Sequence, residues 1–238
     1  MEFENKVSIV TGAGQGIGFE ICRSLAREGG KVVLNDIDKD LALQATSEIN
    51  KQYKKSCSAV VGDSGDMGII MKLIETAVSN YGLLNIVIAN AGITLFGDFL
   101  TYSREYFNKV MEVNLAGSFF LAQAAAKQMI LQGRGGSILF TSSVTGHQAH
   151  KNLAAYGMSK AALEMLAKNL VIELSEYKIN VNAIAPGATL TERTLVNPDY
   201  EKTWSDLTPM GRPAFVKDIA DSALFLVSDK AQHITGQT

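Results

Sequence analysis

Short apolar runs alternate with longer segments of helical periodicity along the whole chain, and this alternation limits the possible folds most strongly. The apolar runs occupy residues 6–11, 31–35, 57–62, 84–89, 136–141 and 179–185. A strand that is buried on both faces of a sheet reads as such a run. Strands that alternate with helices form βαβ units with right-handed crossovers and parallel strands. The sequence therefore predicts an α/β fold with a doubly wound parallel sheet.

The segments between the strands carry helical signals. Ile17, Ile21 and Leu25 recur every fourth residue and predict a helix over residues 16–28, and Asp38 is the expected N-cap of the next helix. Further helices are expected over residues 66–80, 104–131, 153–177 and 216–227, with an irregular, proline-interrupted segment at 187–213. No linker divides the chain, so we expect a single domain over residues 1–238.

Composition excludes several classes of protein. Apolar residues make up 47% of the 238 residues and charged residues 19%, which is too apolar for a disordered chain. The net charge of −2 offers no basic stripe for nucleic acid. Cys22 and Cys57 are too few for a disulfide scaffold, and nothing suggests a metal site. The acidic N-terminus and the lack of a membrane-length apolar run predict a cytoplasmic protein without a membrane partner.

A glycine-rich turn joins the first strand to the first helix. Residues 11–18 read T-G-A-G-Q-G-I-G, the pattern T-G-x-x-x-G-x-G, which has one residue more than the standard dinucleotide fingerprint G-x-G-x-x-G. Glycines at this corner allow the backbone to approach a pyrophosphate, and the helix that follows directs free N–H groups at it. The alternative is a surface loop, but the strand before and the helix after favour a phosphate site.

Asp36 bears on the choice of cofactor. It ends the second strand, 22 positions after Gly14, where a carboxylate accepts hydrogen bonds from an adenosine ribose. Such a carboxylate repels a 2′-phosphate, and no Lys or Arg stands at 35, at 37 or in the glycine turn. NAD is therefore favoured over NADP, although an Asp that caps the following turn is compatible with the same sequence.

Further motifs follow in a fixed order. Asn90-Ala91-Gly92 comes after the fourth strand and Asn114 lies in the long helix. Ser143, Tyr156-x-x-x-Lys160 and Pro186-Gly187 follow later in the chain. In this order and spacing the chain resembles the classical short-chain dehydrogenase/reductase family over nearly its whole length. The resemblance implies a single-domain Rossmann fold with strand order 3-2-1-4-5-6 and NAD(P)-dependent oxidoreductase activity. It also implies a seventh strand that begins where residues 234–238 lie. That strand looks truncated, so we expect an open sheet edge beside the sixth strand.

The residue types agree with that chemistry. Tyr156 and Lys160 are four positions apart and share one helix face, and a neighbouring ammonium favours the phenolate form of a tyrosine. Tyr156 then exchanges a proton with the alcohol or carbonyl, while Ser143 polarises the same oxygen. The resemblance implies that Lys160 also binds the nicotinamide ribose and that Asn114 holds a water beside Lys160. Taken alone, Ser143 is an ordinary turn residue and Asn114 an ordinary helix residue.

The resemblance also implies a set of cofactor contacts. Asp63 would meet the adenine amino group, although Asp66 leaves this register open, and Thr189 and Thr191 would meet the nicotinamide carboxamide. The expected cofactor-binding residues are Gly12, Gly14, Gln15, Gly16, Ile17, Gly18, Asp36, Ile37, Asp63, Ser64, Asn90, Ala91, Gly92, Tyr156, Lys160, Pro186, Gly187, Thr189 and Thr191.

Substrate contacts are expected from a mobile lid over residues 188–213 and from the loop 144–153 opposite it. Ser143, Tyr156 and His150 are the expected substrate-binding residues. His147 or His150 is either a second acid/base or an exposed loop histidine. Other candidates are Leu95, Phe96, Asn152, Arg193 and Trp204.

The expected reaction interconverts a secondary alcohol and a carbonyl. The lid resembles that of bacterial glucose 1-dehydrogenases, and the core resembles 3-oxoacyl-acyl-carrier-protein reductases equally well. Asp36 weighs against the second, mostly NADP-dependent group, so a sugar is slightly preferred. A non-catalytic NAD-binding protein or another Rossmann enzyme, such as a methyltransferase or sugar epimerase, are the remaining alternatives.

An oligomer is also implied by the resemblance. We expect a homotetramer or homodimer, built through the long helix around Asn114 and the helix after Tyr156. The alanines 122 and 124–126 suit close helix approach between copies, or equally packing of that helix against its own sheet.

Overall fold

Six parallel strands form one sheet in the order β3-β2-β1-β4-β5-β6, as the sequence predicts. The computed structural model describes all residues 1–238. The strands are β1 (Val7–Val10), β2 (Lys31–Asp36), β3 (Cys57–Val61), β4 (Ile86–Ala89), β5 (Gly136–Thr141) and β6 (Ile179–Ile184). The sheet reverses its direction of winding between β1 and β4, which is where doubly wound folds bind their ligands.

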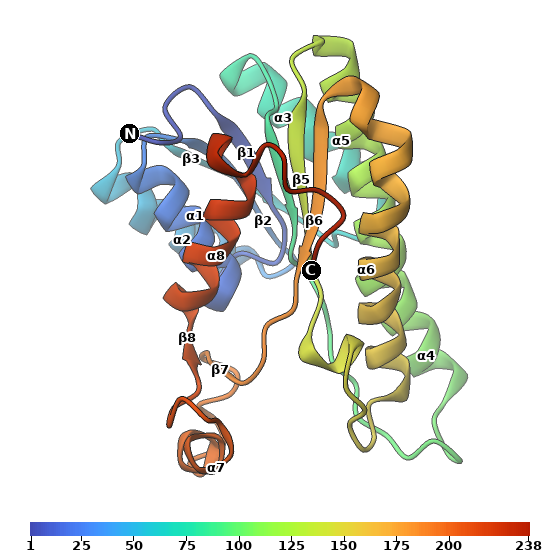
Figure 1. Cartoon of the computed structure of the whole chain (residues 1–238). Coiled ribbons are helices and arrows are strands. Elements are labelled where there is room, and N and C mark those ends of the chain that lie inside the picture. The colour runs from blue at the N-terminus through green and yellow to red at the C-terminus, as the bar shows by residue number, and fades with distance from the viewer.

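Helices cover both faces of this sheet (Figure 1). One face packs against α1 (Gly16–Arg27), α2 (Lys39–Gln52) and α8 (Val216–Val227), and the other against α3 (Met67–Tyr81), α5 (Ser118–Gln132) and α6 (Ala154–Leu174). The N-cap prediction for α2 is confirmed, because the Asp38 carboxylate accepts hydrogen bonds from the backbone N–H groups of Asp40 and Leu41.

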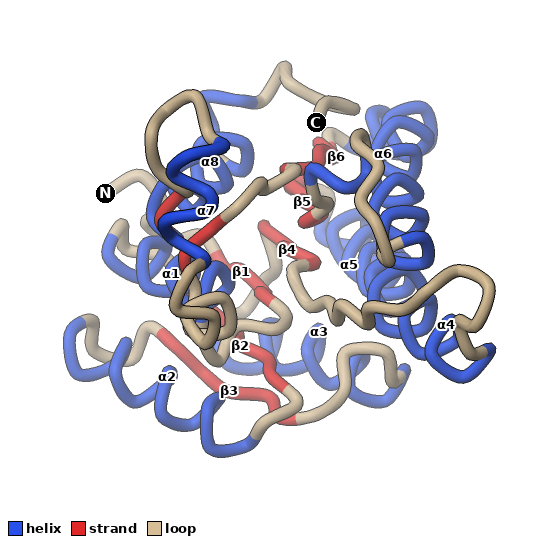
Figure 2. Tube along the Cα trace, turned by 90° about the horizontal axis from the view of Figure 1, so that it is seen from below, coloured by secondary structure: helices blue, strands red, loops and turns tan.

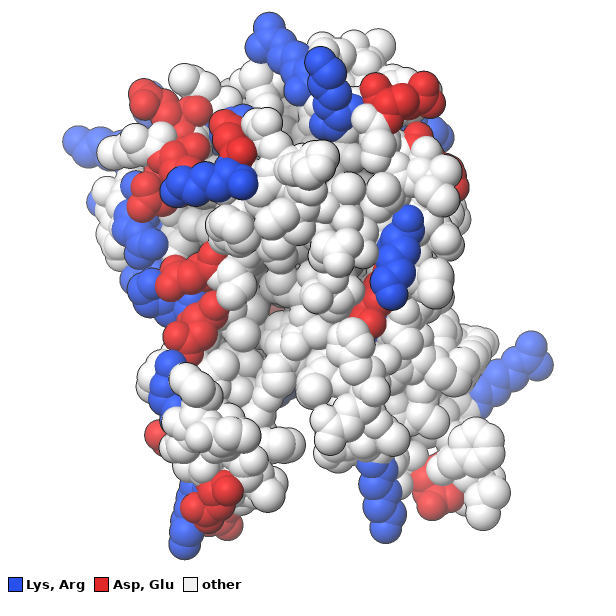
Figure 3. Space-filling view, in the orientation of Figure 1, with Lys and Arg blue, Asp and Glu red and all other residues white.

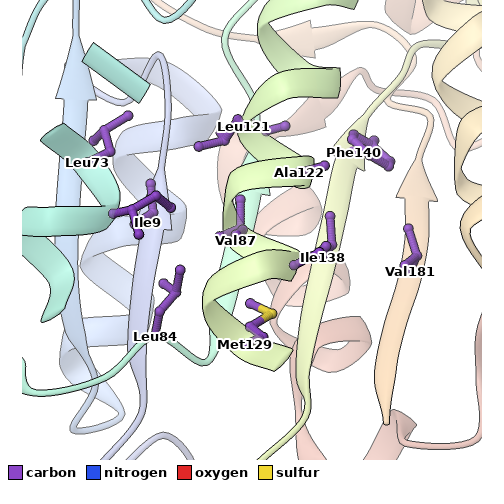
Figure 4. Packing of buried hydrophobic residues seen from close by; sticks show 14 of the residues in the cluster. Ile9, Leu73, Leu84, Val87, Leu121, Ala122, Met129, Ile138, Phe140 and Val181 are labelled. Carbon is purple, nitrogen blue, oxygen red and sulfur yellow. The ribbon is translucent and has the colours of Figure 1, made fainter. Parts of the chain in front are cut away.

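Consecutive strand residues point into two different cores. Ile9 packs on the α5 side and its neighbour Val10 on the α1 side, as the period of two in a strand requires. Figure 4 shows the α5-side core, in which strand residues such as Val87 and Phe140 meet Leu121 and Met129 of α5, all 1% exposed or less. Burial on both faces explains why the strands read as apolar runs.

The alanines of α5 pack mostly against the protein's own sheet. Ala122, Ala125 and Ala126 are buried in the α5-side core, and Ala124 is half-buried against it. Of the two interpretations of this alanine stretch, intramolecular packing accounts for the buried three. The oligomeric state stays a prediction.

The long helix expected over residues 104–131 is interrupted. It consists of α4 (Arg104–Val110), a π-helical stretch at Met111–Gly117, and α5. Asn114 lies in this stretch and is fully buried. The helix also passes very close to a loop, since a Cβ on Gly117 would lie 2.8 Å from the carbonyl oxygen of Ser64. Single π-turns of this kind occur frequently at functional sites.

The segment 187–213, expected to be irregular, contains ordered structure. Two short strands, β7 (Thr189–Leu190) and β8 (Ala214–Phe215), pair with each other, and α7 (Tyr200–Leu207) lies between them. In Figure 1 this unit lies beyond the lower edge of the sheet, away from the two cores. No residue of α7 is buried, so this helix lacks the contacts with the core that fix the other helices.

The expected open edge beside β6 is wrong in part. The chain end runs along β6, where the Gly236 N–H donates to the carbonyl of Val181 at 2.7 Å and the carbonyl of Gln237 accepts from Ala183 at 2.8 Å. The side chain of Asn182 adds bonds to the backbone of Ile234 and Gln237. These bonds pair part of the exposed edge although residues 234–238 form no regular strand.

The surface mixes both signs of charge. Figure 3 shows Lys, Arg, Asp and Glu interspersed, with a broad uncharged area around the chain end. None of the helices has both the length and the hydropathy that crossing a membrane requires. No group of three or more potential metal-ligating side chains is present.

The double-sided core leads to a stability prediction. Replacing Phe140 by Ala removes a fully buried ring between β5 and the helices of the α5 side, and should lower the free energy of unfolding by about 3–5 kcal/mol. Urea denaturation followed by circular dichroism measures this. The same change at Phe99, which is 79% exposed, should cost less than about 0.5 kcal/mol. Equal losses at both positions would contradict the described core.

Candidate active site

One cleft lies at the carboxyl ends of the strands and collects residues from every part of the chain. Figure 2 looks onto this edge of the sheet, and Figure 3 shows the molecule hollowed there between the α7 side and the α6 side. Nearly all the expected cofactor residues line the cleft, from the glycine turn to Thr191. Gly14 does not line it, and Asn114 lies behind the wall, while His150 belongs to a neighbouring cavity.

Several lining residues were not predicted from the sequence. No motif marks them, because they reach the cleft only through the path of the backbone. They are Asn35, Ile93, Thr94, Lys109, Val113, Thr141, Ser142, Glu192, Thr194 and Tyr200.

The glycine turn leaves room and donors for a phosphate. Gly12 has φ +59°, and a Cβ there would lie 2.7 Å from the Cα of Ala91. The helix α1 starts at Gly16 without any side-chain cap, so its first N–H groups are free to bind an anion. This backbone fits the pyrophosphate of a dinucleotide.

Asn90 ties the turn to the end of β4. Its side-chain amide donates to the carbonyls of Thr11 and Gly12, both at 2.9 Å. The hydroxyl oxygen of Thr11 in return accepts from the N–H groups of Asn90 and Ala91, both at 3.1 Å. The two loops on either side of the topological switch are therefore held as one unit.

Asp36, the last residue of β2, lines the cleft. One carboxylate oxygen accepts from the N–H of Gly14 at 2.9 Å and the other from the N–H of Asp38 at 3.0 Å. The carboxylate thus orders its own turn, as the alternative interpretation expects, and Asp36 also lines the cleft. Its hydrogen bond to an adenosine ribose stays a prediction.

Asp63, rather than Asp66, is the acidic residue of the next loop that lines the cleft. Asp66 instead caps α3 by accepting from the N–H of Ile69. The pKa of Asp63 is lowered, first by the hydrogen bond from the N–H of Gly65 at 2.9 Å and then by Lys109, whose ammonium lies 3.1 Å away. The carboxylate of Asp63 is therefore held in its charged form.

Lys160 is an almost fully buried ammonium, 3% exposed. Its Nζ donates to the carbonyl of Thr141 at 2.7 Å and lies 5.6 Å from the ring centroid of Tyr156. Burial, and next the charge of Arg193, lower its pKa from 10.5 to about 8. Gly92 leaves room for the ammonium of Lys160, because a Cβ at residue 92 would lie only 3.2 Å from Nζ.

Ser143 begins a short 3₁₀ turn, Val144–Gly146. Its Oγ accepts from the Thr145 hydroxyl at 3.0 Å and weakly from the Thr145 N–H at 3.3 Å. Its own hydroxyl hydrogen stays available for an oxygen in the cleft. Ser143, Tyr156 and Lys160 all line the cleft.

Asn114 supports the cleft from behind. Its Oδ1 accepts from the Ile93 N–H at 2.8 Å, and its Nδ2 donates to the Ile93 carbonyl at 3.0 Å and to Ser159 at 3.1 Å. The side chain thus joins the loop after β4 to α6. The water that the resemblance implies between Asn114 and Lys160 stays a prediction. The hydroxyl of Ser118 donates to the backbone carbonyl of Asn114 at 2.8 Å.

A second cavity adjoins the cleft between the loop 144–150 and the α7 unit. His150 and Trp204, both expected near the substrate, line it. Its other lining residues include Gln148, Met210 and Arg212, which fall in the expected loop and lid but were not named as candidates, and Asp218 of α8, which lies outside both segments. The remaining substrate candidates do not gather there: Phe96 is 62% exposed, Arg193 lines the cofactor cleft, and His147 bonds elsewhere.

The buried ammonium of Lys160 leads to a pH prediction. Between pH 8 and 10.5 the unfolded chain binds more protons at this residue than the folded chain, so folded-state stability rises with pH across that window. The full rise is about 3 kcal/mol. The comparison of wild-type protein with Lys160→Met by urea denaturation from pH 7 to 10.5 isolates this effect, because other titrating groups are common to both. Parallel stability curves would contradict the lowered pKa.

Comparisons with known proteins agree with this geometry. A family model described as enoyl-(acyl carrier protein) reductase matches residues 12–238. L-rhamnose-1-dehydrogenase of Scheffersomyces stipitis is 35% identical over 97% of this chain and 92% of its own length. L-rhamnose 1-dehydrogenase (NAD(P)(+)) of Azotobacter vinelandii is 35% identical over 98% and 93%, respectively.

A solved structure is similar over the same extent. The crystal structure of a short-chain type dehydrogenase/reductase from Mycobacterium marinum superposes with a TM-score of 0.93, at 28% identity, over 99% of this chain and 93% of that one. Sequence, fold and the residues gathered in the cleft therefore point the same way: the chain belongs to the classical short-chain dehydrogenase/reductase family and is an oxidoreductase.

Proposed function

We propose that this protein is an NAD-dependent dehydrogenase that oxidises a secondary alcohol to a carbonyl, with a sugar hydroxyl as substrate. The observation that carries the proposal is the joint lining of one cleft by the glycine turn, Asp36, Ser143, Tyr156 and Lys160. The bound nicotinamide would supply the hydride acceptor. The protein's own residues then have to bind, orient and deprotonate the alcohol.

The residues present fit the cofactor. The free N–H groups at the start of α1 would hold the pyrophosphate, and Asp36 would accept from the adenosine ribose. Asp63 and Ser64 would border the adenine, while Thr189 and Thr191 would border the nicotinamide carboxamide. Gln15, Ile17, Ile37 and the residues Ala91, Gly92, Pro186 and Gly187 complete the lining.

Tyr156 is the proposed general base. In the oxidation direction its phenolate takes the hydroxyl proton of the alcohol, and Ser143 donates a hydrogen bond to the same oxygen. The Lys160 ammonium, 5.6 Å from the Tyr156 ring, stabilises the phenolate and binds the nicotinamide ribose. Asn114 joins the loop after β4 to α6, the helix that carries Tyr156 and Lys160.

A sugar suits the second cavity. Trp204 offers an aromatic face, and Gln148, His150 and Arg212 offer hydrogen-bonding groups around it. Cavities that recognise polar substrates combine an apolar wall with a few such groups. The names of the two L-rhamnose dehydrogenase relatives support the same substrate class. The segment 188–213, which carries α7, is the proposed lid.

NAD is the proposed cofactor because of Asp36. The carboxylate repels a 2′-phosphate, and its two hydrogen bonds to Gly14 and Asp38 hold it at the adenosine end of the cleft. Lys109, which also lines the cleft, is already paired with Asp63 and is therefore not free to neutralise a 2′-phosphate.

A substitution at Tyr156 tests the mechanism. Tyr156→Phe should lower kcat by about 10²–10⁴-fold, because the proton acceptor is lost, while NAD⁺ affinity stays unchanged. NADH formation is followed at 340 nm with a panel of sugars, polyols, hydroxyacyl thioesters and steroids. Tyr177→Phe, a change at an exposed tyrosine, is the matched control. Full activity of Tyr156→Phe would remove the catalytic assignment, and preferred turnover of the thioesters would favour an acyl-carrier-protein reductase.

A second substitution tests the cofactor choice. Asp36→Asn keeps an oxygen for the Gly14 N–H but removes the charge that opposes a 2′-phosphate. The NADP⁺/NAD⁺ ratio of kcat/KM should rise by about tenfold or more. Asp38→Asn, two residues away at the N-cap of α2, should leave the ratio unchanged. A wild-type preference for NADP⁺ would overturn the role given to Asp36.

A further inference from the structure

A buried carboxylate lies one helical turn beyond Lys160 and has no part in the mechanism above. Glu164 of α6 is 7% exposed, although charged side chains are rarely buried unless they are paired. Tyr156, Lys160 and Glu164 follow each other at intervals of four residues, so all three lie along one face of α6. Glu164 is therefore the buried third member of the row that Tyr156 and Lys160 form on α6.

The partner of this carboxylate is the residue next to the proposed catalytic serine. The hydroxyl of Ser142, 2% exposed, donates to Oε1 of Glu164 at 2.6 Å. The same hydroxyl also lies 2.9 Å from the carbonyl of Lys160. A hydroxyl has one proton, and an ionised oxygen at the shorter distance is the stronger acceptor.

The turn after Ser143 folds over the same carboxylate. A Cβ on Gly146 would lie 2.6 Å from Oε1 of Glu164 and 3.1 Å from the hydroxyl of Ser142, so a side chain at residue 146 would push against this carboxylate. The imidazole of His147 lies 3.1 Å from Oε1 as well, through Nε2. Residues on both sides of Ser143 thus converge on one oxygen atom.

This arrangement joins the two elements that carry the proposed chemistry. Ser143 lies on the turn, and Tyr156 lies on α6. Only their relative placement allows both groups to reach one substrate oxygen, and a shift of about 1 Å in such a placement costs on the order of 100-fold in rate. Glu164 bonds the turn to the helix beside this pair.

We propose that Glu164, acting through Ser142, is a positioning residue that holds the Ser143 turn in register with Tyr156. The inference rests on the proposed function of Ser143 and Tyr156. The carboxylate touches neither substrate nor cofactor. Its effect is carried by the hydroxyl of Ser142 and by the packing of Gly146 and His147 against it.

A set of four variants tests this coupling. Glu164→Ala and Ser142→Ala should each lower kcat about 10- to 100-fold, with the dissociation constant for NAD⁺ changed less than about twofold. The double variant should be no worse than the poorer single one, because both changes break the same link. Glu164→Gln keeps an acceptor oxygen for Ser142 and should restore kcat to within about threefold of wild type.

Glu173→Ala is the matched control, since Glu173 lies on the same helix and is exposed. It should leave kcat and the dissociation constant at wild-type values. Independent, multiplicative losses in the double variant, or a Gln variant as impaired as the Ala variant, would overturn the proposal. If Glu164→Ala does not fold, the other two variants still test the proposal: Ser142→Ala should lower kcat and Glu164→Gln should not, and the opposite result would overturn it.

Hydrogen exchange separates this inference from the proposed function. In Glu164→Ala, amide exchange in a peptide covering residues 142–148 should rise at least about tenfold, whereas exchange in α1 should not change. This measurement needs no substrate. Unchanged exchange would overturn the positioning role, while raised exchange in a protein that oxidises no alcohol would overturn only the proposed function.

Discussion

Burial of the sheet on both faces is the constraint on which the rest of the structure depends. Residues such as Ile9 and Val10 fill two separate cores, so neither face of the sheet has room for a polar site. Polar chemistry is thereby confined to the loops at the ends of the strands. The glycine turn, Asp36 and Ser143 all occur where a strand ends, and the parallel direction of the strands brings them to one edge.

This arrangement forces several polar side chains beneath that edge to be buried away from water. Lys160, Asn114 and Glu164 are buried, and each is held by a hydrogen bond to the backbone or to a serine hydroxyl. The lowered pKa of Lys160 shows that these bonds do not fully replace water around the ammonium. The protein thus keeps an incompletely solvated ammonium next to Tyr156, where the proposed chemistry needs a positive charge.

Prediction from sequence succeeded where the signal is local. Continuous apolar runs marked the six strands, a period of about 3.6 residues marked the helices, and the family resemblance gave the strand order. It failed where a distant contact decides the conformation. The π-helical stretch at Asn114, the hydrogen bonds of Gly236 to β6 and the entry of Lys109 into the cleft all depend on residues far away in the sequence.

The sequence by itself determined the fold class and the residues of the motifs, because glycine, proline and apolar periodicity act over a few neighbouring residues, while the strand order came from the family resemblance. Only the tertiary structure decided that Asp63 rather than Asp66 lines the cleft, and that α5 packs its alanines inward. It also decided that Ser142 and Glu164, 22 residues apart, share a hydrogen bond. These outcomes are contacts between separate elements, and no local pattern records which elements the folded chain brings together.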